Sequence, residues 1–418
     1  MQPKIGIILI NYKTYAKRFL EDCRDSMRLI DYPREKYTVY IVDNATTPET
    51  EAYLREMYPE AVILPNKENS GWGGGNNVGI ERAFADGCED IVLSNMDVIV
   101  DRAWLKELVE AAYSDEQERT PSNSPSERGR KDFSLPAPKF PPLPEGGRGG
   151  VGGRGGSNRP IGIIQSKLLL WPIKDGVQRI NSVGNQIHFL GFGFAGKNGE
   201  PDESRNPSQP PLNLPPKADQ PRAERGGDIV DIPYASGASC YVKGEVFRRV
   251  GLCNADFFMY HDDMEFCLKS KLAGFRVVLA PKSIMWHKYE FGRSILQVYY
   301  MERNRLITML QFYKIPTLIL FAPAFFLMEL GLLGASIVGK YAKPKVRGWG
   351  YFLKPSSWKK LLTERRQIQK LRTITDRTLM ADFTGCVLHQ EMMNPLLKYI
   401  VNPLFNAYWQ VAKRVMWW

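Results

Sequence analysis

Short runs rich in Ile, Val and Leu alternate with stretches of helical periodicity through the first hundred residues. The runs expected to form buried strands are Ile5–Ile10, Thr38–Val42, Ala61–Leu64 and Asp90–Ser94. Helices are expected between them at Ala16–Leu29, Thr50–Met57 and Asn77–Ala85. This alternation predicts an α/β fold with a mainly parallel central sheet covered on both faces. Further along, a strand is expected at Ala238–Val242 and a helix at Gly244–Val250.

Two segments rich in Pro and Gly interrupt this pattern, at about residues 114–160 and 201–227. Such a composition cannot bury enough apolar area to offset the entropy lost on ordering, so both segments are expected to be disordered surface insertions within one domain. The Gly-Arg repeats of the first segment raise the alternative of RNA binding. Because no aromatic residues interleave the arginines, no nucleic-acid partner is expected.

The net charge of +11 favours polyanionic partners such as nucleotide phosphates or anionic lipid headgroups, although a solvated basic face would give the same number. The six cysteines are scattered without any Cys-x-x-Cys pair, which argues against a zinc site or a disulfide scaffold and suits a reducing compartment. The apolar run at the N-terminus ends too soon for a secretory signal, so the N-terminal part is expected in the cytoplasm.

A long apolar segment, Ile315–Val338, stands in the C-terminal part of the chain. It exceeds the roughly 20 residues that a bilayer span requires. Pro316, Pro323 and Glu329 interrupt it, so a spanning, re-entrant, interfacial or buried helix all remain open. Membrane contact is favoured because basic residues follow at once, namely Lys340, Lys343, Lys345 and Arg347.

The tail from Trp358 onward has a basic amphipathic pattern, with Leu361, Leu362, Ile368 and Leu371 on one helical face. Its tryptophans, Trp409, Trp417 and Trp418, suit a membrane interface, and packing on the catalytic domain is the alternative. The expected organisation is therefore a catalytic domain over 1–310, a membrane-associated helix or hairpin over 311–345, and amphipathic helices over 346–418.

Polar residues end three of the predicted strands, as Asn11-Tyr12, Asp43-Asn44 and Asn95-Met96-Asp97. Ligands of open α/β sheets bind outside the carboxyl ends of the strands, so these residues are expected around one crevice. The segment Asn69–Asn77, which opens a predicted helix, adds glycines that let the backbone approach an anionic ligand closely. A flexible turn is the alternative for that segment.

Two more patterns carry chemistry. Asp97 has the character of a ligand for Mg²⁺ or Mn²⁺ and requires a second protein ligand, for which His287 is the candidate. Asp262, Asp263 and Glu265 crowd together behind an aromatic run. Neighbouring buried acids raise one another's pKa, which suits a general base, whereas an ordinary acidic helix N-terminus would show the same residues.

Taken in order, these motifs resemble the family-2 glycosyltransferases of GT-A fold, particularly the rhamnosyl- and galactofuranosyl-transferase-like branch, over residues 4–310 without the insertions. The resemblance implies that Asp263, of the pair Asp262-Asp263, is the catalytic base, and that Asp97 and His287 hold the metal. It implies donor-binding roles for Asn11, Tyr12, Asp43, Asn44, Asn69, Gly71, Trp72, Gly74, Asn76 and Asn95. Glu265 and Lys269 depart from the family, which more often has Asp and Arg there.

The implied function is inverting, metal-assisted transfer of a sugar from a nucleotide-diphosphate donor to a hydroxyl of a glycan acceptor, lipid-linked because of the membrane-facing C-terminus. The implied location is the cytoplasmic face of a membrane, either peripheral or with a single hydrophobic anchor. A nucleotide-sugar-binding protein without catalysis is the main alternative, since it would not need Asp263 or His287. A processive synthase would need more spanning helices than the sequence offers.

Overall fold

The computed structural model describes residues 2–119, 159–203, 228–289, 295–387 and 395–418. The two predicted insertions, 114–160 and 201–227, fall for the most part outside these residues. Only their edges are described, and the first edge is helical, because helix α4 runs over Trp104–Arg119.

One sheet of ten strands organises the molecule, in the order β10-β12-β6-β11-β4-β1-β2-β3, with β5 paired to β12 and β7 paired to β6. The strands of the N-terminal half, β1 to β4, pair in parallel, and β11 enters antiparallel between β4 and β6. A small hairpin of β8 and β9 stands apart. The strand bounds are β1 Ile5–Asn11, β2 Tyr37–Asn44, β3 Val62–Asn66, β4 Asp90–Ser94, β5 Val98–Val100, β6 Ile161–Leu170, β7 Ile180–Ser182, β8 Asn185–Ile187, β9 Gly193–Ala195, β10 Val230–Asp231, β11 Ser239–Lys243 and β12 Arg276–His287.

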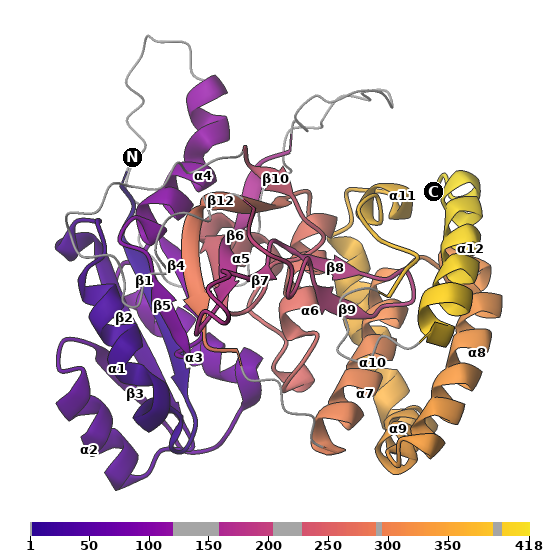
Figure 1. The fold of residues 1–418 in the computed structure, drawn as a ribbon, viewed down its shortest axis with the longest axis horizontal. Coiled ribbons are helices and arrows are strands. Elements are labelled where there is room, and N and C mark those ends of the chain that lie inside the picture. Colours follow the sequence, from indigo (N-terminus) through magenta and orange to yellow (C-terminus); the bar gives the residue numbers. More distant parts are fainter. Residues whose placement is uncertain (1, 120–158, 204–227, 290–294, 388–394) are drawn as a thin grey trace.

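Helices cover both faces of this sheet (Figure 1). One face packs on α1 (Tyr15–Arg28), α2 (Pro48–Met57) and α4, and the other on α3 (Gly71–Ala85), α5 (Gly244–Val250) and α6 (Asp262–Leu272). Side chains alternate along each strand. In β1, Ile7 and Leu9 therefore pack on the side of α1, α2 and α4, and Ile8 packs on the side of α3, α5 and α6. The predicted α/β architecture, with a mainly parallel sheet between two helical layers, is confirmed.

Helix α3 differs from the prediction, because it begins at Gly71 rather than at Asn77. The glycine-rich segment is therefore mostly helix and not a turn. Close packing explains why glycine is used there in spite of its low helix propensity. A Cβ atom on Gly79 would lie 2.5 Å from Ile8, and one on Gly71, whose φ is +72°, would lie 2.2 Å from the Phe258 carbonyl oxygen.

The C-terminal third is helical and gathers at the end of the molecule opposite α1 and α2 (Figure 1). Its aromatic residues enter the same core as α3, α5 and α6, and the rings of Phe189 and Trp409 stack with centroids 5.4 Å apart. Trp418 donates from its indole N–H to Thr317 of α8. The helices are α7 Ile295–Phe312, α8 Ile315–Val338, α9 Ala342–Gly350, α10 Pro355–Lys370, α11 Asp376–Leu379 and α12 Asn402–Val415, the last preceded by a π-helical turn, Leu397–Val401.

Helix α8 is long and apolar enough to cross a membrane, the one such helix among the described residues. Two predictions about its surroundings need correction. Lys345 is not a free flanking charge, because it is buried and ion-paired with Glu302 and Glu329. Trp409 is not at the surface either, because the aromatic core encloses it, whereas Trp417 is 76% exposed.

Replacing Trp409 by alanine tests whether α12 belongs to the core. Removal of a fully buried indole leaves a cavity, so we expect Trp409→Ala to lower the free energy of unfolding by about 3–5 kcal/mol. Chemical denaturation of the full chain measures this loss. Trp417→Ala, at the exposed indole eight positions later, serves as the control and should change stability by less than about 0.5 kcal/mol.

Candidate active site

The polar ends of β1 and β2 lie side by side, as predicted, because Asn11 and Asp43 are partners in the parallel register. Both side chains are fully buried. The Asn11 amide donates to Asp43 Oδ1 over 2.7 Å, and the Thr50 hydroxyl donates to Asp43 Oδ2 over 2.5 Å. Both side chains thus make hydrogen bonds inside the protein, and their contact with a nucleotide stays a prediction. Tyr12, which follows Asn11, is 40% exposed.

A second amide network joins the end of β2 to the start of α3. Asn44 Nδ2 donates to Asn69 Oδ1 over 3.0 Å and to the Gly71 carbonyl over 3.1 Å, while Asn44 Oδ1 accepts from the backbone N–H of Ser70. Asn69 Oδ1 also accepts from the Gly71 N–H. Asn44 and Asn69 therefore hold the segment in shape and have few groups left for a ligand.

Gly74 and Asn76, also predicted to bind the donor, are buried within α3. The Asn76 amide donates back to the Trp72 carbonyl of the preceding turn. Neither residue lines the pocket described next, whereas Trp72 does. Of the predicted Asn69–Asn76 stretch, Trp72 is thus the residue that lines the pocket.

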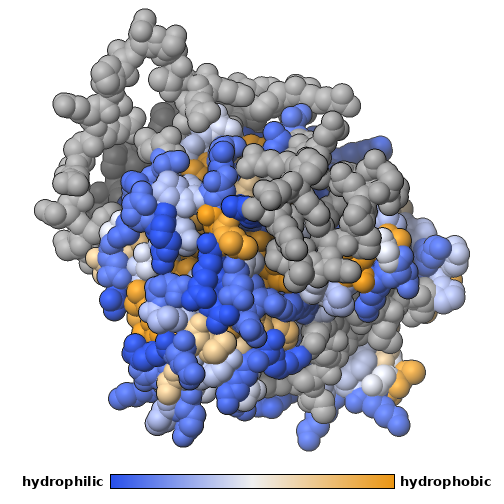
Figure 2. Space-filling model, turned by 60° about the vertical axis from the view of Figure 1, so that its left-hand side comes forward, coloured by the Kyte–Doolittle hydropathy of each residue, from blue (hydrophilic) through white to orange (hydrophobic). Residues whose placement is uncertain are grey.

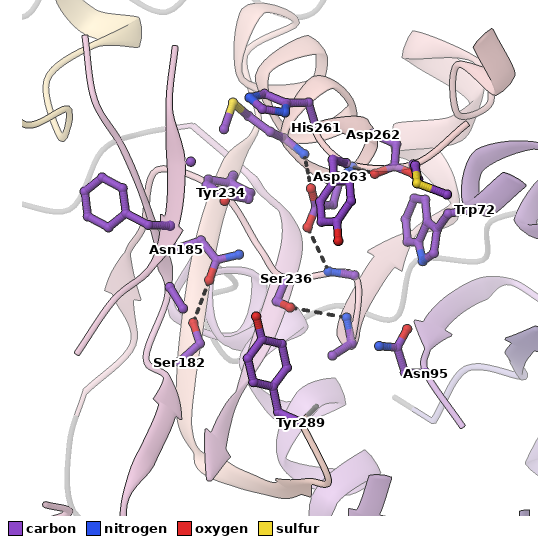
Figure 3. Close-up of a pocket in the computed structure, with 18 of the residues that line it drawn as sticks. Trp72, Asn95, Ser182, Asn185, Tyr234, Ser236, His261, Asp262, Asp263 and Tyr289 are labelled. Carbon is purple, nitrogen blue, oxygen red and sulfur yellow. Dashed lines mark hydrogen bonds between the residues drawn. The ribbon is translucent and has the colours of Figure 1, made fainter. Parts of the chain in front are cut away.

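A pocket of about 490 Å³ opens between the end of the sheet and the start of α6 (Figure 3). Five of the predicted site residues line it, and they come from widely separated parts of the chain: Trp72, Asn95, Asp262, Asp263 and His287. The rest of its wall is rich in amides and hydroxyls, contributed by Asn181, Ser182, Asn185, Asn198, Tyr234, Ser236, Tyr260, Tyr289 and Gln297. The chain therefore brings its acidic pair, its indole and its imidazole to one cavity.

His287 and Asp97 meet although 190 positions separate them: His287 Nε2 lies 3.2 Å from Asp97 Oδ1. On the other side of the ring, Nδ1 donates to Asn181 Oδ1 over 2.9 Å, because the amide oxygen can only accept. In the neutral ring this leaves a lone pair on Nε2 facing a carboxylate oxygen. Two acceptors at this distance need a proton or a metal cation between them.

The surroundings of Asp97 add a tyrosine that the sequence alone did not indicate. Burial raises the pKa of the Tyr15 hydroxyl, and the adjacent Asp97 carboxylate, to which it is hydrogen-bonded, raises that pKa further. Tyr15 therefore stays neutral and acts as a hydrogen-bond donor to the Asp97 carboxylate. Such second contacts orient a carboxylate ligand.

Asp262 and Asp263 begin α6 and are not equivalent. Burial and the charge of Asp263 raise the pKa of Asp262, and one of its buried oxygens has no hydrogen-bond partner. Burial also raises the pKa of Asp263, but the backbone N–H groups of Gly237 and Met264 donate to its two oxygens and oppose that rise. Asp263 therefore ionises before Asp262, and it is the carboxylate of the pair.

The chain that leads into this pair is conformationally strained. Phe258, Tyr260 and His261 all have positive φ angles, of 64°, 62° and 65°. Left-handed conformations cost free energy for residues other than glycine, so the surrounding structure must hold them in place. Asn304 of α7 does this: its buried side-chain amide donates to the carbonyls of Phe257, Met259 and Tyr260 over 2.9, 3.0 and 2.8 Å, respectively.

Comparison with known proteins bears on this geometry. A family model described as glycosyl transferase family 2 matches residues 5–120. Over these residues the chain is similar to glycosyl transferase family 2. The curled, mostly parallel sheet between helices is the GT-A-like architecture that the resemblance implied. No curated protein sequence matches the chain significantly.

Solved structures of low similarity also match. GalNAc-T7 with UDP, GalNAc and Mn²⁺ aligns with 75% of this chain at a TM-score of 0.47 and 11% identity. The mannosyltransferase PcManGT from Pyrobaculum calidifontis, in complex with GDP-Man and Mn²⁺, aligns with 89% of this chain at a TM-score of 0.42 and 14% identity. TarS of S. aureus aligns with 98% of this chain at a TM-score of 0.42 and 13% identity. The chain spans 49%, 86% and 55% of these three proteins, in that order. At these scores none of them supports an inference about this chain.

We predict that Asn304→Ala loosens the strained loop before α6. The substitution removes this donor from the Met259 and Tyr260 carbonyls, while the Phe257 carbonyl keeps the Met259 N–H, so we expect a loss of about 1–3 kcal/mol in the free energy of unfolding. Hydrogen exchange of the full chain should show faster exchange at residues 257–261 in particular. Gln410→Ala removes an exposed amide instead, and an equal effect from it would contradict the assignment.

Proposed function

We propose that this chain is a family 2 glycosyltransferase that transfers a sugar from a nucleotide-diphosphate donor to an acceptor hydroxyl, with inversion at the anomeric carbon. The observation that carries the proposal is that His287, which meets Asp97, lines the same pocket as Asp263. A protein that only bound nucleotide sugars would have no use for a buried carboxylate there. The rhamnosyl- or galactofuranosyl-transferase-like branch, the glycan acceptor and its lipid anchor are finer parts of the same proposal.

The donor set at Asp97 and His287 fits a divalent metal. A carboxylate oxygen of Asp97 and Nε2 of His287 lie 3.2 Å apart, and both are donor types that could hold one such ion together. Within the described ranges no third His, Cys, Asp or Glu joins the two. Mg²⁺ and Mn²⁺ commonly complete their shells with water and substrate phosphate oxygens, so two protein ligands suffice. When bound, the metal would neutralise charge on the departing diphosphate.

The chain's own residues perform the rest of the step. The acceptor hydroxyl oxygen attacks the anomeric carbon, its proton passes to an oxygen of Asp263, and the bond from the anomeric carbon to the diphosphate oxygen breaks. The Gly237 and Met264 N–H groups hold the Asp263 carboxylate at the pocket wall. Asp262 is the protonated neighbour, which keeps a second negative charge away from the acceptor.

Asp263→Asn removes the base while keeping the shape of the side chain. We expect the transfer rate to fall about 10²- to 10⁴-fold, the usual contribution of a general base, with donor affinity unchanged. Asp262→Asn should cost far less, since Asp262 already carries a proton. The measurement is nucleotide-diphosphate release across a panel of nucleotide sugars with Mg²⁺ or Mn²⁺, with Asp25→Asn at an exposed position as control. Full turnover in Asp263→Asn would refute the assignment of the base.

The rate should depend on pH through the same group. Burial raises the pKa of Asp263 to about 6. A base acts only when ionised, so the rate is full above that pH and should fall about tenfold for each unit below it. Steady-state rates at saturating donor measure this profile. A rate independent of pH between about 5 and 7 would exclude Asp263 as the base.

Metal affinity offers a test that does not depend on turnover. We expect Asp97→Asn and His287→Ala each to weaken Mn²⁺ binding in the presence of a nucleoside diphosphate by about 100-fold, and Asn181→Ala, which removes the partner of His287 Nδ1, by about 10-fold. Isothermal titration calorimetry measures these affinities. Unchanged Mn²⁺ affinity in His287→Ala would show that the imidazole is not a ligand.

A further inference from the structure

We propose that the outer faces of α8 and of the segment 396–417 form one surface that lies on an anionic lipid bilayer without crossing it. The inference rests on the proposed function only in that a membrane-bound acceptor would be reached there. We call this surface, which would contact the lipid, the apolar face.

Large apolar side chains crowd the apolar face. Ile319, Phe326 and Leu330 of α8 are each 69% exposed. The remaining members are Ile315, Leu327, Ile337 and Val338 on α8, and Leu396, Tyr399, Ile400, Leu404, Val411, Val415 and Trp417 on the second segment. By contrast, the side of the molecule shown in Figure 2, which carries α1 and α2, is mostly hydrophilic. An apolar concentration of this extent marks an interaction site.

The two helices are firmly joined, so their outer sides act together. The Trp418 indole donates to the Thr317 hydroxyl over 2.8 Å, and the Tyr408 hydroxyl donates to the Leu320 carbonyl. Phe321 and Trp409 pack edge to face, with centroids 6.0 Å apart. Figure 1 shows α8 and α12 adjacent at the end of the molecule.

Charge identifies the occupant as an anionic lipid surface. Apart from the buried Lys345, residues 314–350 and 395–418 together contain seven basic residues, Lys314, Lys340, Lys343, Arg347, Lys398, Lys413 and Arg414, and a single acid, Glu329. That acid is internally paired with Arg305 and Lys345. A second copy of this chain would bring the same positive charge to the contact and would be repelled. Exposed Trp417 and Tyr399 suit the headgroup region, where amphipathic aromatic residues collect.

The inner side of α8 argues against a transmembrane course. Glu329 lies in the middle of the helix and accepts from Lys345 Nζ over 3.0 Å and from the Trp349 indole over 3.2 Å, in addition to its pair with Arg305. At the helix start, Asp376 accepts from the Lys314 N–H and the Thr317 hydroxyl. A spanning α8 would break these contacts and carry a charged carboxylate into hydrocarbon. One side of the helix therefore stays on the protein while the other meets lipid.

Vesicle sedimentation of the full chain tests the proposal. With vesicles of phosphatidylcholine and roughly one-third phosphatidylglycerol, we expect binding that weakens at high salt and with pure phosphatidylcholine. Leu330→Glu and Ile400→Glu should each reduce the partition coefficient about tenfold or more. Lys398→Gln should reduce it about fivefold. Leu29→Glu, at the exposed residue that follows α1, and Lys106→Gln, at an exposed position on α4, are the matched controls and should leave binding unchanged.

Three results would overturn the proposal: no sedimentation with the anionic vesicles, equal losses in the control variants, or resistance of the membrane-bound chain to extraction by alkaline carbonate, which would indicate a span. A dimer held together by the apolar face, seen by light scattering and abolished in Leu330→Glu, would assign the face to a second copy. Transfer to a soluble acceptor should persist in Leu330→Glu, so failure of the membrane proposal and failure of the proposed transferase activity can be told apart.

Discussion

The arrangement of the site depends on the contact between His287 and Asp97, and the pairing of strands in the sheet enforces that contact. Asp97 directly precedes β5, and His287 ends β12; in the antiparallel pairing of these strands Val98 is the register partner of His287. The Lys288 N–H also donates to the Asp97 carbonyl over 2.8 Å. Backbone hydrogen bonds therefore fix the distance between two side chains that lie 190 residues apart in sequence. A one-residue slip would turn one of them to the other face of the sheet.

Local pattern was enough to predict the sheet, both helical layers and the acidic pair, because these follow from hydrophobic periodicity and from residues close in sequence. It was not enough to show which of the polar residues at strand ends make hydrogen bonds within the protein. Asn11, Asp43 and Asn44 end strands as site residues do, yet their hydrogen bonds close on neighbours from other elements. Asn181, which orients His287, has no motif at all, since it acts only through a contact across 106 positions.

The C-terminal helices support the site as well as presenting the apolar face. Asn304 of α7 holds the strained loop before Asp262, while the adjacent Arg305 pairs with Glu329 of α8 and donates to the Leu190 carbonyl. Gly191, the next residue, accepts from the His261 ring over 3.0 Å. The buried charges thus connect α8 to the segment that leads to Asp263. A rigid connection of this kind would keep the pocket at a constant height above the surface on which α8 rests.

The central claim is that one cation is shared by Asp97 and His287. Pulsed electron paramagnetic resonance of Mn²⁺ bound to the full chain with a nucleoside diphosphate tests it most directly, because an imidazole ligand gives a ¹⁴N hyperfine coupling and a diphosphate gives a ³¹P coupling. The account predicts both couplings in the native chain and loss of the ¹⁴N coupling alone in His287→Ala. A spectrum of the native chain with phosphorus coupling and no nitrogen coupling would contradict it.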